Sequence, residues 1–138
     1  MQHDEFIGLV QQRAKLSSRG EAERATRASL ETLGERIPEG TAEHLAAQLP
    51  HEIGEHLRRT EVYGGVGTGE RFDLQEFVGR VARRAGVQAP RAAYFARVVF
   101  EVVDEATQGG LMRKVRDSVP EDIRQLVDAG STGEMNVR

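Results

Sequence analysis

Apolar residues recur at every third or fourth position along most of the chain, which is the spacing of a helix with one buried face. The first such segment is carried by Phe6, Leu9, Val10, Ala14 and Leu16. Further segments run over residues 21–37 and 41–48, and another follows Pro50. Every long segment has this spacing rather than the strict alternation of a half-buried strand. The pattern predicts an all-α protein.

The same series of segments occurs twice. Residues 5–8, Glu-Phe-Ile-Gly, recur as residues 76–79, Glu-Phe-Val-Gly. Residues 49–53 recur as residues 119–123, with the proline and the isoleucine kept. The offset is 71 residues for the first match and 70 residues for the second. An internal repeat of this kind indicates two copies of one structural unit that pack on each other. We therefore expect two tandem four-helix repeats packed into one eight-helix globule.

The repeat also sets the expected organisation of the chain. The first repeat spans residues 1–63 and the second spans residues 73–130, with a Gly-rich linker at residues 64–72. Residues 131–138 have no periodicity and are expected to form a disordered tail. The glycine run at residues 63–70 lacks the GxxxxGK[ST] order of a phosphate-binding loop. It therefore predicts a flexible link or a functional loop rather than a nucleotide site.

Two helix starts carry capping signals. The Ser18–Glu21 and Asp73–Glu76 pairs have the spacing of a capping box, in which a side chain accepts a hydrogen bond from a free backbone amide. Phe72 is placed to pack on Phe77 as a hydrophobic staple at the second of these starts. Both signals predict that a helix of each repeat begins at these residues.

The two long central segments differ in composition. Residues 91–106 are apolar over nearly the whole helix circumference, which predicts that this helix lies at the centre of the molecule. Residues 21–37 are lined by Ala, Ser and Thr and are expected to lie more peripherally. Gly8 and Gly79 share one helix-interior position, where glycine costs about 1 kcal/mol relative to alanine. Close approach of another helix explains this choice, and shared descent of the two copies is the alternative.

Composition narrows the class of protein. The 138 residues include no cysteine, which excludes disulfides and thiolate metal sites. No apolar run reaches the roughly 20 residues that a membrane span needs. The formal net charge is −3, and five Phe, two Tyr and no Trp make a base-stacking platform improbable. We expect a soluble cytoplasmic protein that binds neither nucleic acid nor membrane and carries no cofactor.

The segment Ala25–Ile37, Ala-Thr-Arg-Ala-Ser-Leu-Glu-Thr-Leu-Gly-Glu-Arg-Ile, is followed by Leu-Ala-Ala-Gln-Leu-Pro at residues 45–50. This combination resembles the domain-of-unknown-function 2267 family, and the resemblance covers about residues 5–127. The second copy departs from the pattern, since Ala-Arg-Val-Val at residues 96–99 replaces the small-residue run. The resemblance implies an all-helical bacterial or archaeal protein with tandem copies. It carries over no catalytic residues.

One short run contains two histidines with acids between them. His51 and His56 are five positions apart, whereas the zinc-protease pattern needs histidines four apart on one helix face. The extra residue turns the two side chains about 140° away from each other. Glu52 and His56 have the spacing of a weaker two-ligand metal site, with His44 as a candidate third ligand. The alternative is that all of these are solvated polar residues.

Charged residues also recur at equivalent positions of the two copies. Arg13 matches Arg84, and Glu35 matches Glu105. A buried Glu–Arg pair within each copy explains this recurrence, either by specifying packing or by lining a pocket. We favour the structural explanation.

Two basic clusters lie in the second copy. Their members are Arg80, Arg83 and Arg84 in one, and Arg113, Lys114 and Arg116 in the other. We interpret them as solvated helix faces, and contact with an acidic partner or an RNA backbone is the alternative. No serine lies in a nucleophile-elbow motif, and the paired carboxylates follow a surface pattern. The sequence therefore does not predict an enzyme.

These observations favour a non-enzymatic binding or scaffold protein that acts through its helix surfaces on another protein or on itself. A first alternative is a carrier of a small apolar ligand, held between the two repeats by Tyr94, Phe95 and Phe100. A second alternative is a metal protein or enzyme that uses Glu52 and His56.

Overall fold

The computed structural model describes residues 1–58 and 71–132, and within these ranges the chain forms eight α-helices and no β-strand. The helices are α1 (His3–Arg13), α2 (Arg19–Arg36), α3 (Glu39–Gln48), α4 (His51–Arg58), α5 (Leu74–Ala85), α6 (Ala89–Ala106), α7 (Leu111–Asp117) and α8 (Glu121–Ala129). The predicted all-α class is confirmed. No helix among the described residues is both long enough and apolar enough to span a membrane. The Gly-rich run at residues 63–70 lies outside the described residues.

The order of the helices follows the repeat in the sequence. Helices α1 to α4 precede the linker, and α5 to α8 follow in the corresponding positions. Both α2 and α6 have 18 residues. The leading phenylalanines Phe6 and Phe77 are each 0% exposed, and the matching isoleucines Ile53 and Ile123 are buried in both halves. That the two halves are copies of one duplicated unit stays a prediction.

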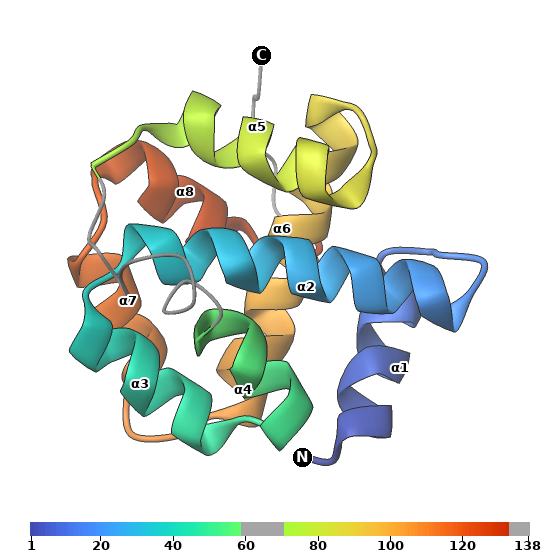
Figure 1. The fold of residues 1–138 in the computed structure, drawn as a ribbon, viewed down its shortest axis with the longest axis horizontal. Coiled ribbons are helices and arrows are strands. Elements are labelled where there is room, and N and C mark those ends of the chain that lie inside the picture. Colours follow the sequence, from blue (N-terminus) through green and yellow to red (C-terminus); the bar gives the residue numbers. More distant parts are fainter. Residues whose placement is uncertain (59–70, 133–138) are drawn as a thin grey trace.

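Helix α2 crosses the middle of the molecule (Figure 1). It packs against α1, α4, α5 and α6, so it contacts helices of both halves. In the view of Figure 1, α4 lies below α2, α5 lies above it, and α6 runs behind it at a steep angle. Helix α6 packs in turn against α1, α5 and α8. The core therefore forms around two crossing helices, one from each half.

This arrangement corrects the expectation that α2 is peripheral. The small residues of α2 do not mark an outer helix but let other helices come close. A Cβ atom at Gly34 would lie 2.5 Å from the carbonyl oxygen of Leu57 on α4. At Gly54 of α4 a Cβ atom would lie 2.6 Å from the carbonyl oxygen of Ala46 on α3. The prediction that α6 lies at the centre is correct, but α2 shares that place.

The interpretation of Gly8 and Gly79 as points of close helix approach is wrong. A Cβ atom at Gly8 would meet nothing within 4 Å. At Gly79 it would meet only the guanidinium of Arg83, 3.4 Å away on the same helix. Neither glycine is required by packing, so the shared-descent alternative is the one that the geometry leaves.

The predicted helix starts are present. Ser18 Oγ accepts a hydrogen bond from the amide of Glu21 at 3.2 Å, and Asp73 Oδ1 accepts one from the amide of Glu76 at 2.9 Å. The ring centroids of Phe72 and Phe77 are 6.2 Å apart, as a hydrophobic staple requires.

The ends of α1 and α5 differ in one informative residue. After α5, Gly86 adopts a left-handed conformation with φ of 71°, which glycine tolerates without strain. After α1, the equivalent position is Lys15, which has φ of 56° and is the one non-glycine residue with positive φ among those described. The same turn is therefore built in both halves, but with a strained residue in the first.

Ser131, which the sequence assigns to the disordered tail, is bonded to the helical body. The backbone amide and the hydroxyl of Ser131 donate to Glu101 Oε1 at 3.0 and 3.2 Å, and Arg97 Nε donates to the carbonyl of Gly130 at 2.9 Å. These bonds tie the chain after α8 to α6. Residues 133–138 lie outside the described part of the chain.

Candidate functional site

A polar groove lies between α1, α2 and α4. It has a volume of about 470 Å³ and is lined by His3, Ile7, Gly20, Glu23, Arg24, Arg27, Glu52, Ile53 and His56. Two of these side chains, Ile7 and Ile53, are each 1% exposed and form an apolar floor. The rest of the lining is mostly charged or titratable. We call this hollow the α1–α2–α4 groove.

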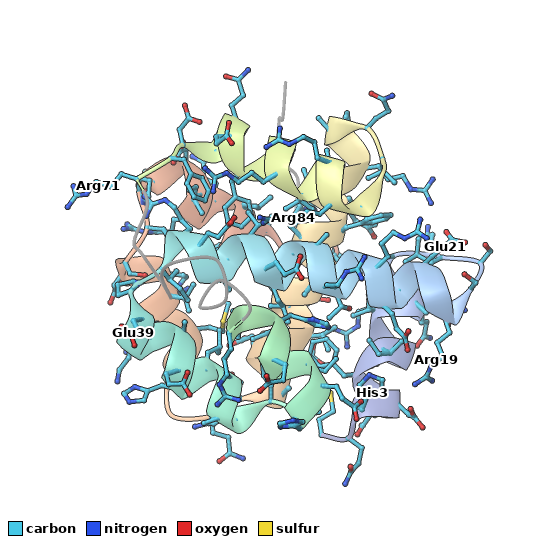
Figure 2. All side chains as sticks on the ribbon, viewed as in Figure 1. His3, Arg19, Glu21, Glu39, Arg71 and Arg84 are labelled. Carbon is cyan, nitrogen blue, oxygen red and sulfur yellow. The ribbon has the colours of Figure 1, made fainter. Side chains whose placement is uncertain are left out.

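The acidic groups of the groove are already engaged by neighbours. Glu23 Oε1 accepts a hydrogen bond from Arg19 Nε at 3.3 Å. Glu52 Oε2 lies 3.3 Å from His3 Nε2. Figure 2 shows His3 and Arg19 on the side of the molecule where α1 meets the beginning of α2. Both carboxylates therefore have neighbours within hydrogen-bonding distance, while they remain part of the groove lining.

Two arginines on the α2 wall are different. Arg24 and Arg27 are exposed and lie three positions apart, so they lie on neighbouring turns of one helix face. Within residues 1–58 and 71–132, neither makes a hydrogen bond or an ion pair with another side chain. The groove thus combines a small apolar floor with two arginines that form no ion pair among the described residues, and Glu23 and Glu52 lie in the same lining.

Only two of the three candidate metal ligands line the same groove. Glu52 and His56 both line the groove, whereas His44 is exposed on α3 and does not line it. In the described part of the chain, no group of three or more His, Cys, Asp or Glu residues is arranged to hold a metal ion. The three candidates are therefore not brought together as one ligand set.

The aromatic residues named for an apolar-ligand pocket belong to the packed interior or to the junction of helices. Phe100 is 1% exposed and meets Phe77 edge-on, with ring centroids 6.1 Å apart. Phe95 is 4% exposed. Tyr94 is half-buried, and its hydroxyl donates to the carbonyl of Arg13 at 3.0 Å. None of the three residues lines the α1–α2–α4 groove.

The recurring arginines and glutamates do pair, but between the halves and not within each one. Arg13 on α1 donates through both terminal nitrogens to Glu105 on α6, at 2.5 and 2.9 Å. Arg84 on α5 donates in the same two-pronged way to Glu35 on α2, at 2.8 and 2.8 Å. The expectation of a buried pair inside each copy is therefore wrong. The pairs join α1 to α6 and α5 to α2, at the partly exposed edges of the helix contacts.

The electrostatics of these two pairs follow from the geometry. The hydrogen bonds of Glu105 raise the pKa of Arg13 above its usual value. Burial raises the pKa of the Glu35 carboxyl, but the hydrogen bonds and charges of Arg84 and Arg80 outweigh burial, so its pKa lies below the ordinary value. Both pairs therefore hold their charged forms. We call the Arg13–Glu105 pair and the Arg84–Glu35 pair the reciprocal clamps.

The basic clusters are mostly neutralised. In the first cluster, Arg80 and Arg84 both contact Glu35. In the second, Arg116 Nη1 lies 3.2 Å from Asp128 Oδ1, while Arg113 and Lys114 are exposed on α7. Neither cluster forms a continuous positive surface.

The groove residues His3, Arg24 and Arg27 were missed by the sequence reasoning. The two arginines sit on the polar side of the α2 pattern and look like any solvated face. Their lack of acidic partners depends on which helices lie opposite, and no local signal reports this. The histidine lies at the very start of the first helix, far in sequence from the residues it meets.

Comparison with known proteins bears on identity alone. No curated protein matches the chain. The family model described as an uncharacterised conserved protein family, DUF2267, matches residues 3–126. This match covers both sets of four helices up to the last turn of α8. The chain therefore belongs to the DUF2267 family.

Proposed function

We propose that this protein is a non-enzymatic binding protein that holds an acidic segment of another protein in the α1–α2–α4 groove. The observation that carries the proposal is the pair of exposed arginines, Arg24 and Arg27, which form no hydrogen bond or ion pair with an acid among the described residues. Carboxylates on a partner would supply the missing charge and can accept two parallel hydrogen bonds from each guanidinium.

The rest of the surface favours polar recognition over an apolar interface. Among the described residues, Met1 is the one large apolar side chain that is exposed, at 41%. Stable apolar docking needs a contiguous patch of several hundred Å². Charged contacts around the small floor formed by Ile7 and Ile53 suit a transient complex whose affinity falls with salt.

The groove also explains why the other two hypotheses are not preferred. The candidate residues of the apolar carrier, Tyr94, Phe95 and Phe100, pack against other parts of the chain. For the metal hypothesis, Glu52 and His56 do line one groove, but the described residues supply no third ligand there. A second copy of this chain remains one source of the acidic segment, since the protein carries more acidic than basic residues.

The test reverses the charge of the groove and compares it with an equal change elsewhere. The groove variant carries Arg24→Glu and Arg27→Glu, and the control carries Arg113→Glu and Lys114→Glu on α7, where the two cations are also exposed and unpaired. The probe is a short fluorescent oligoglutamate peptide, followed by anisotropy at low salt. We expect the groove variant to bind at least about tenfold more weakly than the wild type, since two charge pairs become repulsive.

Native mass spectrometry of the same three proteins, purified from cells at low salt, identifies the natural partner. A partner or second copy that stays with the wild type and the control but leaves the groove variant supports the proposal. Equal losses in the two variants would show that only net charge matters, and the proposal would be wrong.

A further inference from the structure

A second hollow lies on the other side of the molecule, between the end of α2 and the turn that joins α7 to α8. Its volume is about 400 Å³, and its lining is Arg36, Pro38, Arg71, Asp117, Ser118, Val119 and Pro120. This volume is within the range of about 300–1,000 Å³ that small-molecule sites occupy. We call it the Arg36 hollow.

Arg36 is an unusual residue for a position so deep. It is 8% exposed, although arginine is almost never fully buried unless its charge is paired. Its Nε donates to the carbonyl of Phe72 at 2.9 Å. Neither terminal amino group has a hydrogen-bond partner in the described ranges. The four N–H donors of these two amino groups thus remain available at the wall of the hollow.

The nearest acid does not neutralise this cation by direct contact. Asp122 acts on Arg36 electrostatically, but its two oxygens already accept hydrogen bonds from the amides of Leu74 and Ile123, at 2.9 and 2.7 Å. Burial lowers the pKa of the Arg36 guanidinium, and the neighbouring charge of Arg71 lowers it further. Arg36 therefore has both an acid, Asp122, and a second cation, Arg71, in its electrostatic surroundings, and the acid does not form an ion pair with it.

The end of α2 does not require a cation at this position. Arg36 is the last residue of α2, and the equivalent last residue of α6 is Ala106. The same helix thus ends in the second half with a methyl group. A role in ending the helix does not account for Arg36, because α6 ends in the same way without it.

We propose that the Arg36 hollow binds the phosphate group of a small molecule, with Arg36 as the fixed ligand and Arg71 as the second cation. A phosphate monoester carries about −1.5 to −2 charges at pH 7, which matches two guanidinium groups. The planar guanidinium is suited to two-pronged contact with phosphate oxygens. Figure 2 shows Arg71 extending outward at the edge of the molecule, and the same residue contributes to the lining of the hollow.

Asp117 sets the expected selectivity. Its carboxylate is exposed and belongs to the lining of the hollow. Its negative charge opposes the binding of anions, whereas the charges of the two arginines favour it. One extra negative charge there disfavours ligands with several phosphates, because like charges repel in the hollow. The site is therefore assigned to a single phosphate group, either free or carried on a small organic molecule.

The experiment is an NMR titration of the full chain with inorganic phosphate and, separately, with glycerol phosphate, at matched ionic strength in potassium chloride. We expect saturable shifts of the Arg36 Nε–H signal and of the amides of residues 117–119. Tighter binding of glycerol phosphate than of inorganic phosphate identifies a phosphorylated molecule as the ligand, and equal binding identifies free phosphate.

Three variants make the assignment falsifiable. Arg36→Met should lower the phosphate affinity about tenfold to hundredfold, because it removes the fixed cation of the site, and the urea midpoint shows whether the variant is folded. Arg71→Met should weaken binding less, and it serves as the second test if Arg36→Met does not fold. Arg113→Met removes the same charge from an exposed site on α7 and should leave the titration unchanged.

Two results would overturn the assignment. One is a wild-type titration without saturable shifts at the Arg36 hollow, and the other is wild-type affinity in both Arg36→Met and Arg71→Met. The outcome is independent of the α1–α2–α4 groove, because the Arg24→Glu and Arg27→Glu variant leaves every residue of the Arg36 hollow in place.

Discussion

Replacement of Gly34 by alanine tests how closely α4 packs against α2. Gly34 lies in the last turn of α2, where an added methyl carbon would sit 2.5 Å from the carbonyl oxygen of Leu57. Ordinary contact begins at 3.4 Å, so α2 and α4 must separate by about 0.9 Å. The obstacle is a backbone atom, which cannot move away by changing a rotamer. Gly8 on α1 is the matched control, since a methyl group there meets nothing within 4 Å.

The expected changes in the free energy of unfolding have opposite signs for Gly34→Ala and Gly8→Ala. Alanine in a helix interior gains about 1 kcal/mol over glycine at either position. At Gly34 this gain is outweighed by overpacking, which costs about 3 kcal/mol when a backbone must shift. A gap of nearly 1 Å along a helix contact also forfeits roughly a quarter to a half of the dispersion attraction across it. We expect Gly34→Ala to lose about 2 kcal/mol of unfolding free energy and Gly8→Ala to gain about 1 kcal/mol.

Urea denaturation followed by circular dichroism at 222 nm measures both variants against the wild type, with the slope checked for two-state behaviour. Gly54→Ala is a second close-contact variant, because its added carbon would lie 2.6 Å from the carbonyl oxygen of Ala46. If Gly34→Ala and Gly54→Ala were as stable as Gly8→Ala, the close approach of α4 to α2 and α3 would be refuted. The central position assigned to α2 would lose its explanation.

Two further predictions use the same unfolding assay. Lys15→Gly should raise the free energy of unfolding by about 0.5 kcal/mol, because relief of a left-handed lysine, roughly 1–2 kcal/mol, exceeds the extra freedom of glycine in the unfolded chain; a lower stability would contradict this. A double-mutant cycle of Arg84→Met and Glu35→Gln should give a coupling of about 1 kcal/mol at pH 7, since the pair is two-pronged and partly buried. Because the pKa of Glu35 is lowered in the folded state, this coupling is present above the ordinary value of 4.5 and disappears as the pH falls through the lowered pKa. A coupling that persists in strong acid would argue against the ion pair.

Local features of the fold were predictable because local residues determine them. The helical spacing of apolar residues, the side-chain caps at Ser18 and Asp73, and the Phe72–Phe77 contact all act within one turn of the chain. The repeat in the sequence added long-range information, since it predicts a second set of four helices that follows the first. These features place every described helix to within a few residues.

What the sequence could not predict depends on which helices lie opposite each other. Small residues on α2 are compatible with a peripheral helix or with a crowded one, and only the position of Leu57 decides between them. Arg13 and Glu105 recur in the pattern, but their pairing across the halves depends on the crossing of α1 and α6. Burial of Arg36 is a similar case, because its neighbours come from the turn between α7 and α8 and from the segment before α5.

The two proposed sites lie where the halves differ, and this divergence supports their assignment to function. The reciprocal clamps are nearly equivalent, as expected when two like units face each other around a twofold axis. The groove is not equivalent: His3 on α1 corresponds to Leu74 on α5, and His56 on α4 corresponds to Leu126 on α8.

Leu126 is 0% exposed and Leu74 packs on the core, so leucine side chains occupy in the second half the positions that carry histidines in the first. The Arg36 hollow follows the same rule, since Ala106 stands at the equivalent position. Residues that only stabilise packing have no reason to change from leucine to histidine or from alanine to buried arginine, because each change costs stability. The first half accepts these costs at both hollows, and we propose binding of a charged partner or ligand as the reason.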